Sequence, residues 1–102
     1  MPKKIRFKVG QPIRHKIFNY RGVVAEVDPT FQQTTIWYET MTTDSPPKDE
    51  PWYSVLVHDS PCIAYVSQQN LEPDLTGAYI KHPAMSNYFK NLKLENGLYL
   101  KK

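Results

Sequence analysis

The sequence lacks several features that would assign a function class directly. It has one cysteine, Cys62, which excludes an internal disulfide framework. No apolar run approaches the roughly 20 residues that span a bilayer, and the start MPKKIRFKV has no apolar core of a secretory signal. We therefore expect a cytoplasmic protein with no membrane partner, folded as a single domain over residues 1–102.

Acidic residues are absent from the first 22 positions, which carry seven bases. Residues 23–80 carry nine acids and one base, and residues 81–102 carry five bases and one acid. The net charge of +3 thus hides two basic ends and an acidic middle. If the ends meet in the fold, they form a positive patch for phosphates or acidic protein segments; otherwise they are solvated surface.

Short segments of alternating apolar and polar residues predict strands. We expect an extended segment at residues 5–9, strands at about 13–16, 22–28, 52–58 and 62–67, and a short 3₁₀ turn at 68–70. Leu71 then enters the core. Within the second strand, Val23, Ala25 and Val27 alternate with Val24, Glu26 and Asp28, which is typical of a strand buried on one face.

The remaining segments are less regular. Residues 29–50 are rich in proline and charge, which predicts a mobile loop, although residues 33–40 could add a strand. Residues 82–93 predict a helix, because Met85, Phe89 and Leu92 share one face and Pro83 suits its first turn. Together these patterns predict a mainly β protein: a small SH3-like antiparallel barrel, core about 7–73, with one short C-terminal helix in a tail of about 82–102.

Four motifs occur in an order that resembles a known family. They are VGQPIRH, YRGVVAEVDP, PWYSVLV and YVSQQNLEP, and they cover about residues 7–73. In this order they resemble the HspQ/YccV-like family, also called the hemimethylated DNA-binding domain. The later IKHPAMSNYF resembles the tail of the same domain where it is fused to certain eukaryotic F-box proteins.

The resemblance implies an SH3-like barrel. Stand-alone bacterial members are heat-shock proteins, and members are described as binding hemimethylated DNA. They are also described as aiding the degradation of misfolded proteins by ATP-dependent proteases such as Lon. The resemblance implies no enzymatic activity, no catalytic residue and no cofactor.

The first candidate site is a basic and aromatic cluster near one hairpin, formed by Arg14, His15, Lys16, Tyr20 and Arg21. Arginine and lysine there could contact phosphates, and Tyr20 could stack on a base of an open strand. Alternatively, Tyr20 packs the hairpin and the stem of Arg14 covers the edge of the barrel. Sequence-specific DNA recognition has no support from a known DNA-binding motif.

The second candidate site is a set of large aromatic residues. Trp37 and Tyr38 lie in the 29–50 segment, where they either contact a partner or fold back over a mouth of the barrel. Trp52 could help dock a peptide, since aromatic residues are common binding hot spots. We expect its neighbour Tyr53 in the core and leave Trp52 open.

Catalysis and metal binding have weak support. His58, Asp59 and Cys62 could suggest a thiol nucleophile, but they straddle a predicted turn without a third orienting group. Three histidines at irregular spacing do not form a zinc motif, and we expect Cys62 to be a small buried residue.

These patterns and the resemblance predict a non-enzymatic binding protein of the stress response. It would act as an adaptor or modulator of an ATP-dependent protease and would bind that protease and its substrates. The alternative is a DNA-binding module that prefers hemimethylated duplex. Exposed aromatic residues and strand edges also predict a homo-oligomer.

Overall fold

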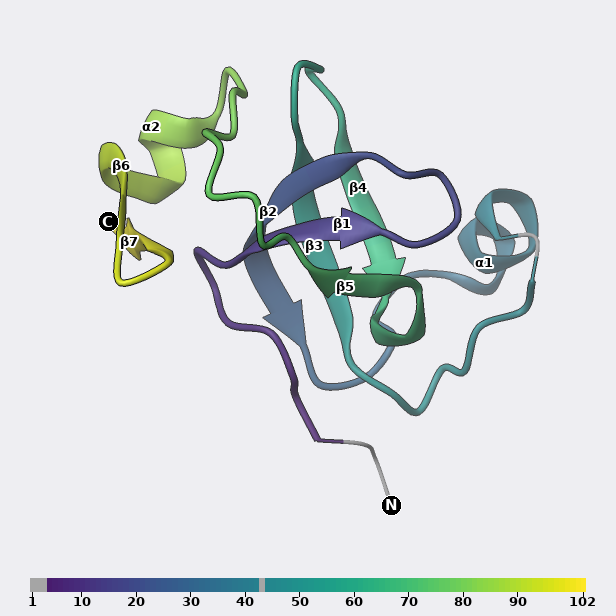
Figure 1. Ribbon diagram of the computed structural model, residues 1–102. Helices are drawn as coiled ribbons and strands as arrows, with labels where there is room; N and C mark the ends of the chain where they lie inside the picture. The colour runs from purple at the N-terminus through teal and green to yellow at the C-terminus, as the bar shows by residue number, and fades with distance from the viewer. Residues whose placement is uncertain (1–3, 43) are drawn as a thin grey trace.

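A computed structural model describes residues 4–42 and 44–102 and shows a mainly β protein (Figure 1). The first sheet contains β1 (Pro12–His15), β2 (Arg21–Asp28), β3 (Trp52–Val57), β4 (Ile63–Ser67) and β5 (Leu71–Pro73). Its strands are antiparallel in the order β4-β3-β2-β1-β5. The 3₁₀ turn η1 (Gln68–Asn70) links β4 to β5, which are the two outermost strands in this order. The small antiparallel architecture expected from the sequence is confirmed.

A second, two-stranded sheet and two short helices complete the fold. The sheet pairs β6 (Phe89–Glu95) with β7 (Leu98–Lys101), and α2 (Met85–Tyr88) precedes it. The other helix, α1 (Thr35–Met41), lies in the connection between β2 and β3. Figure 1 places α1 at one end of the molecule and α2, β6 and β7 at the opposite end.

Strand β2 is buried on both faces, not on one as its alternation predicts. Val24 packs in a core cluster with Ile13, Tyr53, Val55 and other residues inside the bent sheet. Val23 and Ala25 pack instead against a second cluster supplied partly by α2 and the β6–β7 sheet. A bulge between Val24 and Glu26 shifts the register, so Val27 faces the same cluster as Val24.

The N-terminal segment is fastened to the first sheet by Tyr53. Its hydroxyl accepts hydrogen bonds from the backbone N–H groups of Arg6 and Phe7, at 3.2 and 3.3 Å, and donates to Gln68 Oε1. Gln68 also accepts from Arg6 N–H, at 2.9 Å. Phe7 is buried, as are Tyr53 and Leu71, which confirms the expected core positions of the last two.

Residues 33–40 were expected as a possible strand, and this is wrong. The hydroxyl of Thr34 accepts a hydrogen bond from Trp37 N–H, at 3.0 Å, and so caps the start of α1. Trp37 and Tyr38 of this helix then pack against Trp52 of β3 through aromatic contacts and not through strand hydrogen bonds. Whether the 29–50 segment is mobile stays a prediction.

The helix expected over residues 82–93 is also largely wrong, because it ends at Tyr88. Asn91 and Leu92 have φ angles of +60° and +49°, which a right-handed helix does not contain. The segment from Phe89 onward pairs with β7 through a turn at Asn96-Gly97, where both residues have positive φ. This pairing buries Phe89 beside Tyr99.

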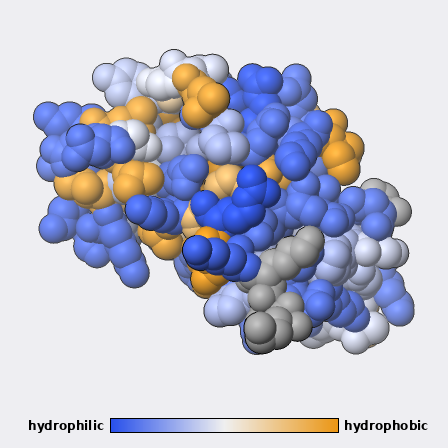
Figure 2. Space-filling model, turned by 60° about the horizontal axis from the view of Figure 1, so that its bottom comes forward, coloured by the Kyte–Doolittle hydropathy of each residue, from blue (hydrophilic) through white to orange (hydrophobic). Residues whose placement is uncertain are grey.

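The two basic ends of the chain meet. Tyr99 N–H donates to the carbonyl of Gly10, at 2.8 Å, and Gly10 N–H donates to Val24 O, at 2.8 Å. The C-terminal sheet therefore packs directly on the N-terminal segment. At this end, Figure 2 shows hydrophobic side chains at the surface between hydrophilic ones. In the described part of the chain, no helix has the length and apolar character needed to cross a membrane.

Candidate functional site

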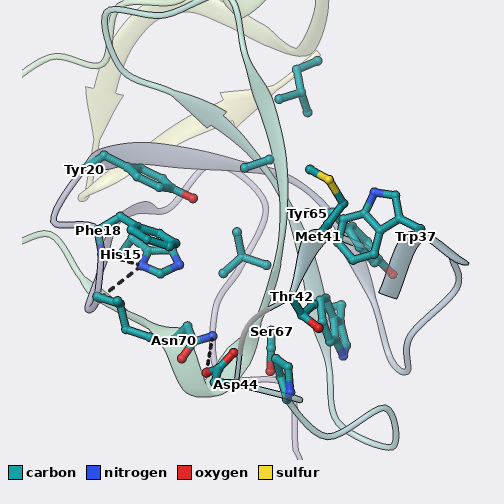
Figure 3. Close-up of a pocket in the computed structure, with 16 residues that line it drawn as sticks. His15, Phe18, Tyr20, Trp37, Met41, Thr42, Asp44, Tyr65, Ser67 and Asn70 are labelled. Carbon is teal, nitrogen blue, oxygen red and sulfur yellow. Dashed lines mark hydrogen bonds between the residues drawn. The ribbon is translucent and has the colours of Figure 1, made fainter. Parts of the chain in front are cut away.

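A groove of about 330 Å³ lies between the β1–β2 turn and α1, with β4 as its floor (Figure 3). His15, Phe18 and Tyr20 form the wall on the turn side. Trp37 and Met41 of α1 form the opposite wall. Residues distant in the sequence therefore create one concave surface.

The turn-side wall is organised by the His15 ring. Its Nδ1 accepts hydrogen bonds from the backbone N–H groups of Ile17 and Phe18, both at 3.1 Å. The ring also lies 4.8 Å from the Phe18 ring and 5.0 Å from the Tyr20 ring. Asn19, with φ of +60°, allows the chain to turn back and pair Tyr20 O with His15 N–H, at 2.8 Å.

The α1-side wall belongs to an aromatic cluster formed by Phe31, Trp37, Tyr38, Trp52 and Tyr65. Tyr65 stacks on Trp52 with a centroid distance of 5.3 Å and meets Trp37 edge-on at 5.5 Å. Phe31 packs between Tyr38 and Trp52, at 5.4 and 4.9 Å. Such offset and edge-to-face pairs contribute about 0.5–1.5 kcal/mol each beyond the area that they bury.

Polar atoms of this cluster find partners in the surrounding chain. Trp52 Nε1 donates to Pro47 O at 3.0 Å, and Tyr38 donates to Pro46 O at 2.6 Å. The Tyr65 hydroxyl donates to Asp28, also at 2.6 Å. These bonds hold the 29–50 segment against β3 and β4, which is the fold-back arrangement considered for Trp37 and Tyr38.

Two titratable side chains of the groove have shifted pKa values. Burial lowers the pKa of His15, and the nearby Asp44 carboxylate opposes this only in part. Burial raises the pKa of Tyr20 to about 12. At neutral pH the His15 imidazole and the Tyr20 phenol are therefore both uncharged.

Four of the eight residues predicted from the sequence line this groove: His15, Tyr20, Trp37 and Trp52. Tyr38 lies behind the wall, within the aromatic cluster. The bases Arg14, Lys16 and Arg21 are not among the lining residues. The structure thus brings aromatic residues of both predicted sites together in one groove. The basic residues of the first predicted site lie outside the groove lining.

Arg21 has a structural partner. Its Nε donates to Asp74 Oδ2 at 2.7 Å, and its Nη2 donates to Ala78 O, also at 2.7 Å. Burial would raise the pKa of Asp74, but the bonds from Arg21 and Thr76 outweigh burial and hold this pKa below its usual value. A charge reversal at Arg21 would therefore disturb folding as well as any binding surface.

Several lining residues were missed because no local pattern points to them. Asp44 enters the groove only because the chain after α1 passes beside η1, where Asn70 Nδ2 donates to Asp44 Oδ2 at 3.4 Å. Phe18 and Met41 are 68% and 63% exposed. Large apolar side chains in a predicted turn and in a predicted loop were the available signal.

Cys62 is exposed, so the expectation that it is buried is wrong. It precedes β4 at the end of the β3–β4 turn. His58 Nδ1 accepts from Lys81 N–H at 2.8 Å, and its Nε2 lies 3.3 Å from Asp59 Oδ2. Residues 4–42 and 44–102 contain no group of three or more His, Cys, Asp or Glu that could hold a metal ion.

Comparison with known proteins agrees with the resemblance seen in the motifs. A family model described as "Hemimethylated DNA-binding protein YccV like" matches residues 5–96. F-box only protein 21 of Mus musculus, of Pongo abelii and of Homo sapiens is 33% identical to this chain over 89 residues. The matched region is 85% of this chain but 14% of each relative, so the chain corresponds to a small part of those proteins. The chain therefore belongs to the YccV-like family.

Proposed function

We propose that this chain is a protein-binding module of protein quality control. In this role it acts as an adaptor or modulator that promotes degradation of misfolded proteins by an ATP-dependent protease such as Lon. The groove between the β1–β2 turn and α1 receives apolar segments that a misfolded client exposes. The barrel serves as the rigid support for this surface.

The observation that carries the proposal is the exposed apolar rim of the groove. Ile17, Phe18, Met41 and Ile63 are between 53% and 68% exposed and all line it. Exposed large apolar side chains gathered around one groove mark an interaction surface, because each side chain gains free energy when a partner removes it from water. Aromatic residues beneath the rim supply the rigid contact area typical of binding hot spots.

The test replaces Phe18 and Met41 together by serine. We expect the Phe18→Ser/Met41→Ser protein to bind a permanently unfolded, reduced and alkylated protein about tenfold more weakly or worse, because two large apolar contacts are lost. Fluorescence anisotropy of the labelled client measures the affinity, and the rate of client degradation with purified Lon measures the adaptor role. Ile36→Ser is the matched control, since Ile36 is 77% exposed on α1 and lies outside the groove lining.

Unchanged client binding by the double variant would contradict the proposed function. Equal loss in the double variant and the Ile36→Ser control would also contradict it, because it would show that the groove has no special part in binding.

A second candidate function is binding of duplex DNA with a preference for hemimethylated sites. The description of the family model favours it. The Tyr99–Gly10 backbone contact also supports it, because this contact joins the two basic ends of the chain into one region. This candidate uses a different surface from the groove, so the two functions are separable by mutation.

A further inference from the structure

The groove also contains polar groups beneath its apolar rim, and His15 of the turn-side wall supplies the first of them. Nδ1 of His15 accepts two backbone hydrogen bonds, so the neutral ring must carry its hydrogen on Nε2. Figure 3 shows this second nitrogen on the side of the groove. His15 therefore offers one N–H donor, with fixed orientation, to a bound molecule.

Ser67 supplies the second of these polar groups. It is 1% exposed and lines the groove, and its hydroxyl has no hydrogen-bond partner among residues 4–42 and 44–102. A buried hydroxyl without a partner costs free energy, because it has given up its hydrogen bonds to water. A ligand or a bound water that pairs with Ser67 would recover this cost.

Asp44 supplies the third of these polar groups and sets the charge. Among the described residues that line the groove, it is the one aspartate or glutamate, and no lysine or arginine is among them. His15 is neutral at pH 7 because burial lowers its pKa. The groove lining therefore carries one formal negative charge, which attracts a cation and repels a phosphate.

The walls are suited to a planar cation with an apolar stem. Trp37 and Tyr65 line the groove on the same side as Thr42, and Asp44 and Ser67 lie below them in the view of Figure 3. A guanidinium group stacks on aromatic rings and pairs with a carboxylate through its planar fork, whereas an ammonium group acts as a point charge. Arginine therefore matches this combination of rings and carboxylate better than lysine does.

We propose that the groove recognises an extended segment of a client protein in which an arginine is flanked by apolar residues. The arginine stacks on the Trp37 and Tyr65 side and its charge pairs with Asp44. The flanking apolar side chains cover the exposed rim, and a backbone carbonyl of the segment accepts from His15 Nε2–H. This specificity rests on the proposed protein-binding function and adds a requirement for positive charge.

The test compares two labelled peptides, one with an arginine between leucines and one with citrulline in its place. Citrulline keeps the shape of arginine and removes its charge. We expect the arginine peptide to bind the full chain about fivefold more tightly, the upper range for a solvent-exposed ion pair. Asp44→Asn should make the two affinities equal, whereas Glu39→Gln should keep the difference, since Glu39 is an exposed acid of α1 outside the groove lining.

The outcomes separate this inference from the proposed function. Equal binding of the two peptides by the unmodified chain would overturn the arginine specificity, and so would a difference that survives Asp44→Asn. In both cases the apolar binding and the proposed function would stand. If neither peptide binds, and a single-stranded oligonucleotide binds with an affinity that Trp37→Ala reduces, both the specificity and the proposed function are overturned.

Discussion

His15 is a titratable side chain that the fold keeps buried, with 5% of its surface exposed. Its lowered pKa means that the folded protein takes up a proton less readily than the unfolded chain, whose histidine titrates near 6.5. Stability from this residue is therefore complete above pH 6.5 and decreases as the pH falls through 6.5 toward the folded pKa. A proton on Nδ1 would also break the bonds from Ile17 and Phe18.

We predict that His15→Asn reduces the pH dependence of folding. Between pH 7.5 and 5.5 the original protein should lose more unfolding free energy than the variant, by at most about 1.4 kcal/mol per pH unit for one proton. Urea denaturation of both proteins at the two pH values measures the difference. The comparison cancels contributions from groups that both proteins share, and equal losses in both proteins would show that His15 does not titrate differently on folding.

At the scale of single residues, the sequence predicts burial well where the side chain is large and apolar. Tyr53 and Leu71 are buried as expected, because their burial removes much apolar surface from water. The prediction fails for Cys62, a small residue whose position depends on the neighbouring turn and not on its own hydrophobicity. Asp44 could not be assigned to the site, because its neighbour Asn70 lies 26 positions away in the sequence.

At the scale of elements, the junction between Gly10 and β7 attaches the C-terminal sheet to the rest of the fold. Gly10 has a φ of +90°, and a Cβ atom at this position would lie 2.0 Å from Tyr99 O. Any other residue therefore both strains the backbone and pushes the β6–β7 sheet away.

We predict that Gly10→Ala lowers the unfolding free energy by more than about 1 kcal/mol and weakens protection of the Tyr99 amide. Chemical denaturation and hydrogen exchange measure these two effects. Gly77→Ala is the matched control, because Gly77 also has positive φ, at +72°, but has nothing within 4 Å of its would-be Cβ. If both variants lose the same stability, close packing at Gly10 has no energetic importance.

Helix and strand assignments failed at two segments for related reasons. The apolar spacing of Met85, Phe89 and Leu92 fits a helix, but it does not reveal that residues 98–101 are available as a strand partner. The β-forming residues at 33–40 likewise do not reveal the aromatic partners on β3 and β4. Local periodicity describes which surface a segment can bury, and the partner decides its conformation.

At the scale of the whole molecule, charge is distributed unevenly. The basic ends meet at Gly10 and Tyr99, while Asp44 gives the groove a negative charge. This separation assigns the two candidate functions to different faces. The predicted homo-oligomer stays a prediction.

We predict that any binding of hemimethylated duplex DNA weakens as salt rises, because phosphate contacts release counterions. Lys8→Glu with Lys101→Glu, two exposed bases of the opposite chain ends, should reduce the slope of log affinity against log salt by about two. Fluorescence anisotropy at 50 and 200 mM salt measures this slope, and the reversal of Lys48, a base of the acidic middle, is the control. No binding of hemimethylated duplex at low salt would eliminate the DNA function.

The sequence alone determined strands β1 to β4, the 3₁₀ turn before Leu71 and the family, because these depend on local alternation, turn residues and motif order. Only the tertiary structure decided that β2 is buried on both faces and that His15, Trp37 and Asp44 share one groove. The physical reason is distance along the chain: contacts between remote segments depend on packing and charge that no single stretch of sequence contains.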